Sequence, residues 1–248
     1  MRIRRPVQMV ITLLMLSACA NSGQVESKQG GPTDPQARLE AAISDQDYEG
    51  VRSALVGGAR ADRPLPSRKH PLNWAVHLEN LSIARLLLRS GADPNQLDGL
   101  AESPPLAVAI HAHSRTLVDE LIRAGADPNK RFGDGLCCTS LGLAALAVGG
   151  GAISPLVDGG ADVNAWNLVP ESDYPNGYRS GRAEGRTALM LAAEYGNDLN
   201  VILLLGRGAD PSLRNEHGKA ALDLMGDPTA KMRNALTHPE QYAGLKKR

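Results

Sequence analysis

The stretch Gly91-Ala92-Asp93-Pro94-Asn95 decides the fold of this chain because it recurs at a nearly constant interval. The other copies are Gly125-Ala126-Asp127-Pro128-Asn129, Gly160-Ala161-Asp162-Val163-Asn164, Gly208-Ala209-Asp210-Pro211-Ser212 and a degraded Gly58-Ala59-Arg60-Ala61-Asp62. Their leading glycines are separated by 33, 34, 35 and 48 residues. A period in the thirties predicts a stacked array of one supersecondary unit. Any function should then lie on a surface that several units share.

Two predicted helices precede each copy. Apolar residues recur at i, i+3 and i+4 in Ile83 to Ser90, Leu117 to Ala124 and Asn200 to Arg207, which predicts an amphipathic helix. The glycine that follows can adopt the left-handed conformation that ends a helix. A second, Ala-rich helix lies about twenty residues upstream, as in Thr187 to Ala193.

This order of turn, small helix, larger helix and Gly-Ala-Asp-x-Asn resembles the ankyrin repeat. Thr187-Ala188-Leu189-Met190 is similar to the family's Thr-Pro-Leu-His helix start, whereas the other repeats keep the Leu but lose Thr or His. The resemblance implies an all-α ankyrin-repeat solenoid of stacked helix-turn-helix units with turn or β-hairpin fingers. It covers residues 37–238, as about five repeats and a C-terminal half-repeat from Ala220 to His238, which leaves 239–248 as a tail.

The N-terminus predicts export. Arg2, Arg4 and Arg5 precede an apolar run from Val7 to Leu16 that is too short to span a bilayer. Basic residues, a short apolar core and small residues before a cleavage point are typical of a secretory signal peptide. We therefore expect residues 1–18 to be a signal peptide.

The end of this segment, Leu16-Ser17-Ala18-Cys19, resembles the lipobox of bacterial lipoproteins and implies that Cys19 is lipidated. The alternative is an ordinary signal peptide that happens to contain Cys. Ala20 follows rather than Asp, so the family analogy favours an outer-membrane lipoprotein that faces the periplasm. Residues 19–36 lack the apolar side chains that would offset their ordering entropy, which predicts a flexible tether.

Charge and composition argue against nucleic-acid binding. The chain has 27 Lys and Arg against 27 Asp and Glu, but residues 1–18 contain three of the Arg and no acid. The remainder therefore carries a net charge of −3. Nucleic-acid binding needs a clustered basic face, so we expect a protein partner instead.

Cys137 and Cys138 are adjacent in the turn before a predicted helix. Adjacent Cα atoms lie about 3.8 Å apart, below the usual disulfide range of about 4.4–6.8 Å. Two small, partly buried residues are the simplest interpretation. A vicinal or intermolecular disulfide is the alternative, because an extracytoplasmic location permits oxidation.

Motifs of catalysis or cofactor binding are weak. Gly149-Gly150-Gly151 has no preceding strand and no following Lys, so we interpret it as a turn between two helices. His111 and His113 are two apart on a predicted helix and cannot share a metal ion. His113 stands where many ankyrin repeats have the glycine between helices, which favours a structural role. We expect neither an enzyme, nor a cofactor, nor a metal site.

The family resemblance implies that the fingers and the exposed side of each first helix form a concave binding face. The positions 14 and 13 residues before each leading glycine should point that way: Ser44 and Asp45, His77 and Leu78, His111 and Ala112, Leu146 and Ala147, Glu194 and Tyr195. His77 and His111 thus share one column. They are either solvated helix residues or a pH-responsive contact.

The 48-residue spacing indicates an insertion of 15 residues relative to 33, in the finger from Ala165 to Arg186. Trp, Tyr and Arg dominate interface hot spots, so the predicted partner-binding residues are Trp166, Tyr174, Tyr178, Arg179, Arg182, Tyr195, Glu194, His77, His111 and Phe132. The alternative is a floppy loop whose aromatic residues fold back on their own repeat. Since longer loops cost little stability, we also expect residues 167–184 to be dispensable for folding.

Three functional hypotheses follow. The first is a membrane-tethered periplasmic protein-binding module, in a sharper version an immunity protein that caps a delivered toxin. The second, by family analogy, is a scaffold for a periplasmic enzyme or for oxidative-stress defence. The third is a hydrolase with an unrecognised site. A neighbouring toxin gene would favour the first hypothesis, and a neighbouring catalase or peroxidase gene the second.

Overall fold

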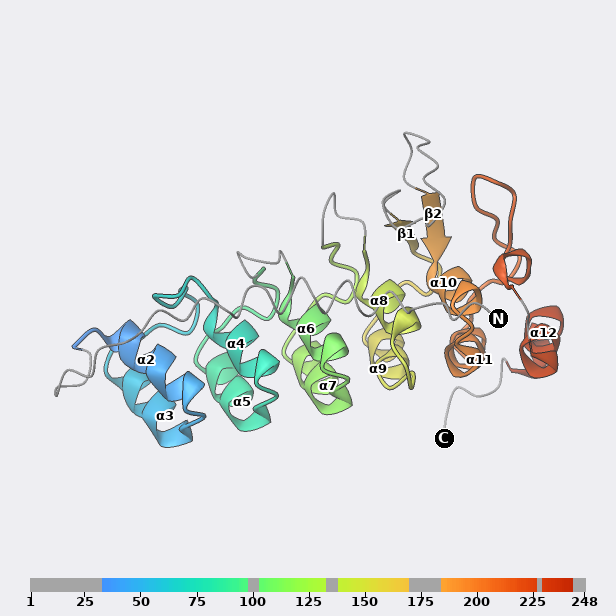
Figure 1. Cartoon of the computed structure of the whole chain (residues 1–248). Coiled ribbons are helices and arrows are strands. Elements are labelled where there is room, and N and C mark those ends of the chain that lie inside the picture. Colours follow the sequence, from blue (N-terminus) through green and yellow to red (C-terminus); the bar gives the residue numbers. More distant parts are fainter. Residues whose placement is uncertain (1–32, 98–102, 133–137, 170–183, 227–228, 243–248) are drawn as a thin grey trace, which may run out of the picture.

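The structure, a computed structural model, describes residues 33–97, 103–132, 138–169, 184–226 and 229–242. These residues contain five pairs of antiparallel helices, stacked in chain order into an elongated array (Figure 1). The pairs are α2 (Pro35–Ser44) with α3 (Tyr48–Val56), α4 (Pro71–His77) with α5 (Leu81–Arg89), α6 (Pro105–His111) with α7 (Arg115–Arg123), α8 (Ser140–Leu146) with α9 (Ile153–Asp158), and α10 (Ala188–Glu194) with α11 (Asp198–Gly206). The expected solenoid of helix-turn-helix units is therefore confirmed.

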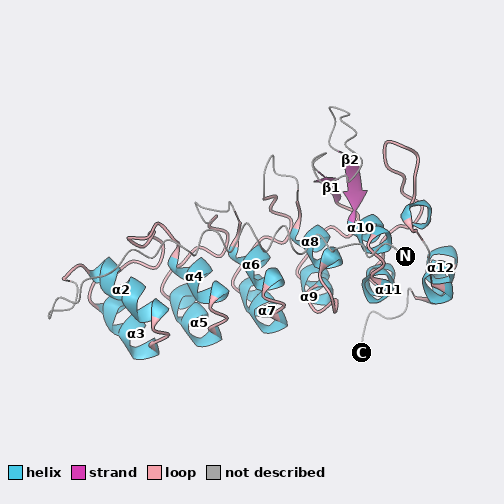
Figure 2. Ribbon diagram, in the orientation of Figure 1, coloured by secondary structure: helices cyan, strands magenta, loops and turns pink. Residues whose placement is uncertain are grey.

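The array has an inner row of first helices and an outer row of second helices. Each inner helix packs on the next inner helix, from α2 to α10, and the outer helices stack in the same way (Figure 2). Ala75, Ala109 and Ala145 of the inner row are fully buried, and their small side chains let neighbouring helices approach closely. The buried residues form one continuous cluster along the array, as a stack of repeats requires.

The recurring glycine ends the outer helix as the sequence predicted. Gly91 has a φ of +89°, and the other leading glycines have values between +90° and +99°. The N–H of Ala92 donates to the carbonyl of Leu87 at 3.0 Å, which satisfies a carbonyl at the end of α5. Only glycine adopts this conformation without a steric penalty from Cβ.

The turn between the two helices of a repeat also passes through the left-handed region. Its residue is Gly196 in the fifth repeat, with a φ of +73°, but Gln46, Glu79 and His113 in the first three repeats, with values of +53° to +55°. The structural role predicted for His113 is therefore confirmed. These three side chains sit in a conformation that costs non-glycine residues energy.

The asparagine of the recurring stretch joins each repeat to the next. Asn95 accepts a hydrogen bond from the N–H of Asp127 at 2.7 Å and donates to the carbonyl of Gly125 at 3.0 Å. Asn129 makes the same pair of bonds to the following repeat, at 2.8 and 2.9 Å. These amides form a ladder along the array, which explains why the phrase recurs.

The degraded first copy has Asp62 at the asparagine position. Arg60 of the same finger binds this carboxylate, with Nη2 at 2.6 Å from Oδ2. The hydrogen bond from Arg60 holds the pKa of Asp62 below its ordinary value. Asp62 thus makes its ion pair within its own finger. Gln36 of α2 fixes the backbone of Arg60, because its side-chain amide accepts a hydrogen bond from the Arg60 N–H and donates one to the Arg60 carbonyl, both at 3.0 Å.

The C-terminal half-repeat is less regular than its sequence suggested. Its first helix is only a short 3₁₀ turn, η3 (Leu222–Leu224), which packs on α10, whereas α12 (Ala230–Thr237) packs on α11. A further 3₁₀ turn, η4 (Pro239–Gln241), lies in the segment expected to be a tail, and the Tyr242 side chain that follows packs against the core. No helix in the described part of the chain has both the length and the apolarity needed to cross a bilayer.

Candidate partner-binding surface

The fourth finger is built on a β-hairpin. Strand β1 (Trp166–Val169) pairs with β2 (Glu184–Thr187) in antiparallel register, with Trp166 opposite Thr187 (Figure 2). Residues 170–183 lie outside the described residues, and with them four of the predicted contact residues: Tyr174, Tyr178, Arg179 and Arg182. The described part of the insertion is thus its base, where the chain leaves the stack and returns to it.

Asn167 locks this base into the stack. Its Oδ1 accepts hydrogen bonds from the N–H and the hydroxyl of Thr139, at 2.8 and 2.9 Å, and its Nδ2 donates to the carbonyl of Arg186 at 3.2 Å. The side chain, only 3% exposed, fills the space above Gly142, where an added Cβ would lie 2.1 Å from Oδ1. The burial and hydrogen bonds of Asn167 argue against the expectation that residues 167–184 are dispensable for folding, because this side chain belongs to the buried frame.

Trp166 is half-buried on the hairpin. Its ring lies against Gly185 of the opposite strand, where an added Cβ would approach ring atom Cε3 to 3.0 Å. Its carbonyl accepts a hydrogen bond from Arg131 Nη2 of the third finger at 2.6 Å. Trp166 thus packs against its own finger and is tied to the preceding one, which leaves only part of the ring accessible.

Glu194 forms an ion pair with a buried arginine. Arg186 of β2 is 3% exposed, and its Nε lies 3.3 Å from Glu194 Oε2. A buried guanidinium needs a counter-charge, so Glu194 holds the hairpin against α10. Tyr195, at the C-terminal cap of α10, is 44% exposed and is the most accessible of the described aromatic residues predicted to contact a partner.

Phe132 does not lie on an accessible surface. It is 5% exposed and pairs with Cys138 through two backbone hydrogen bonds of 3.2 Å, which close the base of the third finger. The prediction that Phe132 contacts a partner is wrong, because its ring belongs to the interior of the finger. Cys137 lies outside the described residues.

Sequence reasoning missed Trp74 on α4. Its ring stacks on His77, with centroids 5.3 Å apart and planes inclined by 15°. Lys69 Nζ lies 3.3 Å from the ring centroid, and the indole N–H donates to the hydroxyl of Ser44 at 3.3 Å. The signal was available, since Trp74 is one helical turn before His77 and therefore shares its face.

The same position in the next two repeats is also apolar. The half-buried residues one turn apart on successive inner helices form a stripe beneath the fingers, with His77 and His111 exposed along it. We call this surface the inner-helix face, and it consists of Trp74, His77, Val108, His111, Leu143 and Leu146. The stripe crosses three repeats, as a site for an extended or folded protein segment requires.

His77 and His111 occupy their predicted column but differ in surroundings. His77 stacks on an indole, whereas nearby groups displace enough water from His111 to lower its pKa below the ordinary value of 6.5, and the charge of His113 adds to this shift. The described residues contain no group of three side chains suited to hold a metal ion. The column therefore presents two separate imidazole side chains with different surroundings.

The outer row has a different character. Glu120 of α7 binds Arg85 of α5 at 2.9 Å and Arg123 of its own helix at 2.8 Å. Hydrogen bonding from Arg85 lowers the pKa of the Glu120 carboxyl. Arg207 of α11 likewise binds Asp158 at the end of α9. Ion pairs thus join neighbouring repeats at two places in the outer row, which also carries the exposed apolar side chains of Val56 on α3 and Leu199 on α11.

Comparisons with known proteins agree with this geometry. A family model described as ankyrin repeats (many copies) matches residues 178–225, and one described as ankyrin repeat matches residues 68–99. The human ASB11 ankyrin repeat domain has a similar structure, with a TM-score of 0.61 and 20% identity over 95% of this chain and 98% of that one. The ankyrin repeat domain of Bcl-3, a member of the IkappaB protein family, gives a TM-score of 0.67 and 24% identity over 85% and 87%.

A search of curated proteins by sequence found no match. The structural similarities, at these identities, concern the fold. Together with the two family models, the helix pairs and the asparagine ladder, they lead to one conclusion. The chain contains ankyrin repeats and adopts the ankyrin-repeat fold.

Proposed function

We propose that this protein is a membrane-tethered periplasmic module that binds another protein through its inner-helix face. Ankyrin repeats imply a protein-interaction module. The observation that carries the choice of surface is the alignment of apolar side chains on consecutive inner helices. Trp74, Val108 and Leu143 occupy the same position in three successive repeats and are half-buried, with the exposed His77 and His111 beside them.

Apolar side chains at the centre of a surface, with polar groups around them, are typical of a protein interface. The stripe is also preformed, because its apolar residues Trp74, Val108, Leu143 and Leu146 pack against the continuous core. A preformed surface binds without the cost of ordering loops. This preorganisation supports a stable complex rather than a passing encounter.

The tether is supported by sequence alone. Leu16-Ser17-Ala18-Cys19 provides the lipidation motif, and residues 19–34 provide the link to the array, since Pro35 and Gln36, expected in the tether, are the first residues of α2. Two or more acyl chains hold a protein stably on a membrane. On this proposal the repeats face the periplasm from the outer membrane and meet their partner there.

We further propose that the partner is a toxin delivered to the periplasm and that the array is its immunity protein. A preformed face can cover an active site without doing chemistry itself, which fits the non-enzymatic role typical of ankyrin-repeat proteins. The scaffold role for a periplasmic enzyme has no separate observation in its favour.

Photo-crosslinking in cells tests the surface. A photoreactive amino acid replaces His77 or His111 on the inner-helix face, and Ser82 or Thr116, exposed on the outer helices of the same two repeats, as matched controls. We expect one discrete adduct from the inner positions and none from the outer ones. An adduct only from Ser82 or Thr116 would move the binding surface to the outer row.

Mass spectrometry of that adduct tests the partner class. A secreted toxin whose activity falls when the array is added supports immunity. A catalase or peroxidase in the adduct supports the scaffold role instead.

A further inference from the structure

The first finger is distinguished by its charge. Residues 59–70 contain four Lys and Arg and a single acid, Asp62, which Arg60 binds at 2.6 Å. Arg63, Arg68 and Lys69 have no ion-pair partner within the part of the chain that the structure describes. The second finger has the opposite character, since residues 92–104 contain Asp93, Asp98 and Glu102 but neither Lys nor Arg. The first finger is therefore a concentrated site of positive charge next to an acidic finger.

The backbone of the first finger is well defined. Leu65 is 3% exposed and anchors the finger to the core. Its N–H donates to the carbonyl of Lys69, and its carbonyl accepts from the N–H of Arg68, both at 2.8 Å. This turn holds Arg68 at a φ of +67°. Arg63 and Arg68 are exposed on either side of Leu65, so the finger presents two guanidinium groups from a fixed turn.

Lys69 links these charges to the inner-helix face. Its ammonium group lies 3.3 Å from the centroid of the Trp74 ring, a cation–π contact that places positive charge directly over the indole. His77 stacks beside the same ring, and Ser44 accepts the indole N–H. We call Arg63, Arg68, Lys69, Trp74 and His77 the basic–aromatic patch.

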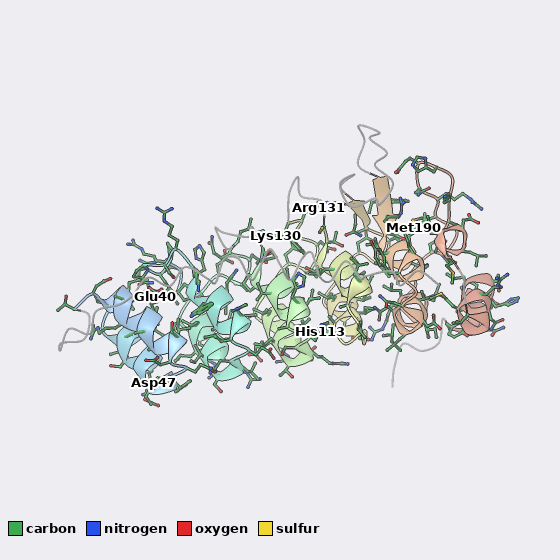
Figure 3. The ribbon with its side chains drawn as sticks, in the orientation of Figure 1. Glu40, Asp47, His113, Lys130, Arg131 and Met190 are labelled. Atoms are coloured by element: carbon green, nitrogen blue, oxygen red, sulfur yellow. The ribbon has the colours of Figure 1, made fainter. Side chains whose placement is uncertain are left out.

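Two acidic groups near the patch accept backbone hydrogen bonds, one of them from the first finger itself. Glu40 of α2 lies below the first finger, where its Oε2 accepts the N–H of Ser67 at 3.4 Å (Figure 3). Asp93 of the second finger accepts the N–H of Asn95 at 2.8 Å and so helps to shape its own turn. The contrast with the third finger is equally clear, because Lys130 there donates to the carbonyl of Asn95 at 2.5 Å.

We propose that the basic–aromatic patch binds an acidic segment of the partner protein. Carboxylates of that segment pair with Arg63 and Arg68, whose planar guanidinium groups suit bidentate bonds. An apolar side chain next to those carboxylates packs against the accessible edge of the half-buried Trp74, beside the contacts that Lys69 and His77 make with its ring. The inference rests on the proposed function, because it specifies the partner's chemistry on the same face.

A protein segment fits this patch better than a nucleic acid. A phosphate backbone needs basic contacts along a continuous track, whereas the finger next to the patch carries three acids and no cation. Complementary charge confined to one finger instead fixes the register of a partner that continues along the apolar stripe. The first finger thus sets where the partner begins, and Val108 and Leu143 contact its continuation.

The binding test uses a fluorescein-labelled peptide of alternating Glu and Leu, followed by fluorescence anisotropy at low and high salt. The matched peptide of alternating Lys and Leu and a single-stranded oligonucleotide are the other two probes. We expect the Glu–Leu peptide to bind, to weaken as salt rises, and to bind more tightly than either control. Tighter binding of the oligonucleotide, or no binding of the Glu–Leu peptide, overturns the proposal.

Charge reversal locates the site. The triple variant Arg63→Glu, Arg68→Glu, Lys69→Glu should bind the Glu–Leu peptide at least about tenfold more weakly. The control Arg52→Glu, Arg89→Glu, Arg233→Glu makes the same change of net charge at exposed residues of the outer helices and should bind unchanged. Equal losses in both triple variants mean that net charge alone acts, which also overturns the proposal.

Two milder variants test whether the loss of binding comes from the patch rather than from unfolding. Lys69→Gln removes only the cation over the indole and should give a smaller loss, and Trp74→Phe keeps a ring in place and should retain part of the affinity.

Crosslinking from His111 in the patch triple variant separates the two proposals. If the adduct from position 111 is undiminished in the triple variant, the proposal of an acidic segment is overturned, but binding at the inner-helix face is not. If there is no adduct even without the three charge reversals, the proposed function itself is overturned.

Discussion

The side-chain oxygen of Asn167 accepts both the N–H and the hydroxyl of Thr139, at 2.8 and 2.9 Å. Thr139 is the N-cap of α8, and its hydroxyl in turn accepts the N–H of Gly142 at 3.0 Å. A residue of the insertion thus completes the start of a helix in the stack. The boundary between the finger and the core lies beyond Asn167.

Two deletions test this boundary. Removing residues 170–183 and joining the ends with a short glycine linker should leave the thermal midpoint almost unchanged, since loop length costs little. Removing residues 167–184 also takes away Asn167 and leaves buried polar groups of Thr139 unpaired, at about 1–3 kcal/mol each. We expect that midpoint to fall by roughly 5 °C or more. Equal midpoints in circular dichroism melts would show that the hydrogen bonds of Asn167 do not contribute to stability.

Gly142→Ala should destabilise the protein, although the same change in an ordinary helix interior stabilises by roughly 0.5–1 kcal/mol. The added Cβ meets Asn167 Oδ1 at 2.1 Å, so the hairpin base must shift. We expect a loss of about 1–3 kcal/mol in denaturant titrations, the usual range for overpacking. Combining the change with Asn167→Ala supplies the control, because the cost of Gly142→Ala should then disappear.

The left-handed turns between paired helices offer stabilising changes. Glycine at Gln46, Glu79 or His113 relieves the Cβ strain of φ values near +55° and should stabilise by about 0.5–1 kcal/mol per site. Gly196, at the matching position of the fifth repeat, is the control, and Gly196→Ala should destabilise by a similar amount. Denaturant midpoints measure both. A loss of stability in all three glycine variants would mean that their side chains matter more than the strain.

His111 should make stability depend on pH. Its folded-state pKa lies below the ordinary 6.5, so the unfolded chain takes up this proton first. The contribution is complete above pH 6.5 and is lost as pH falls through the window below that value. His111→Gln should flatten the stability profile there, as measured by denaturant titration at successive pH values.

Glu120 and Asp62 also have lowered pKa values in the folded protein. Protonation of their carboxyls should still destabilise the His111→Gln variant, but only as pH falls below their ordinary pKa values of 4.5 and 3.8. An unchanged slope just below pH 6.5 in that variant contradicts the assignment to His111.

Cys19→Ser should abolish lipidation. Cells fed a radioactive fatty acid should label the unmodified protein and not the variant, and the variant should leave the membrane fraction. Cys138→Ser is a control that keeps Cys19, and it should label normally. Persistent labelling of the Cys19 variant would show that the segment before it is an ordinary signal peptide.

The sequence predicted the repeat and its turns because their causes are local. The left-handed glycine at Gly91 and the turn after it depend on residues that adjoin in the chain, and so the period alone indicated the stack. The partner-binding residues depend on contacts between repeats, which a single sequence does not display. Phe132 was misplaced because its burial follows from the closed base of its own finger. Trp74 was overlooked although its helical spacing from His77 was visible in the sequence, whereas its contacts with Lys69 and Ser44 were not.

The antiparallel register of β1 and β2 has a consequence for how this molecule can evolve. Because Trp166 stands opposite Thr187, the chain leaves and re-enters the stack at adjacent points, and the two strands fix where the segment between them begins and ends. Doubling its length costs only about 0.6 kcal/mol. Descendants of the gene can therefore exchange that segment wholesale, in size and in composition, and acquire new specificities while inheriting an unaltered scaffold.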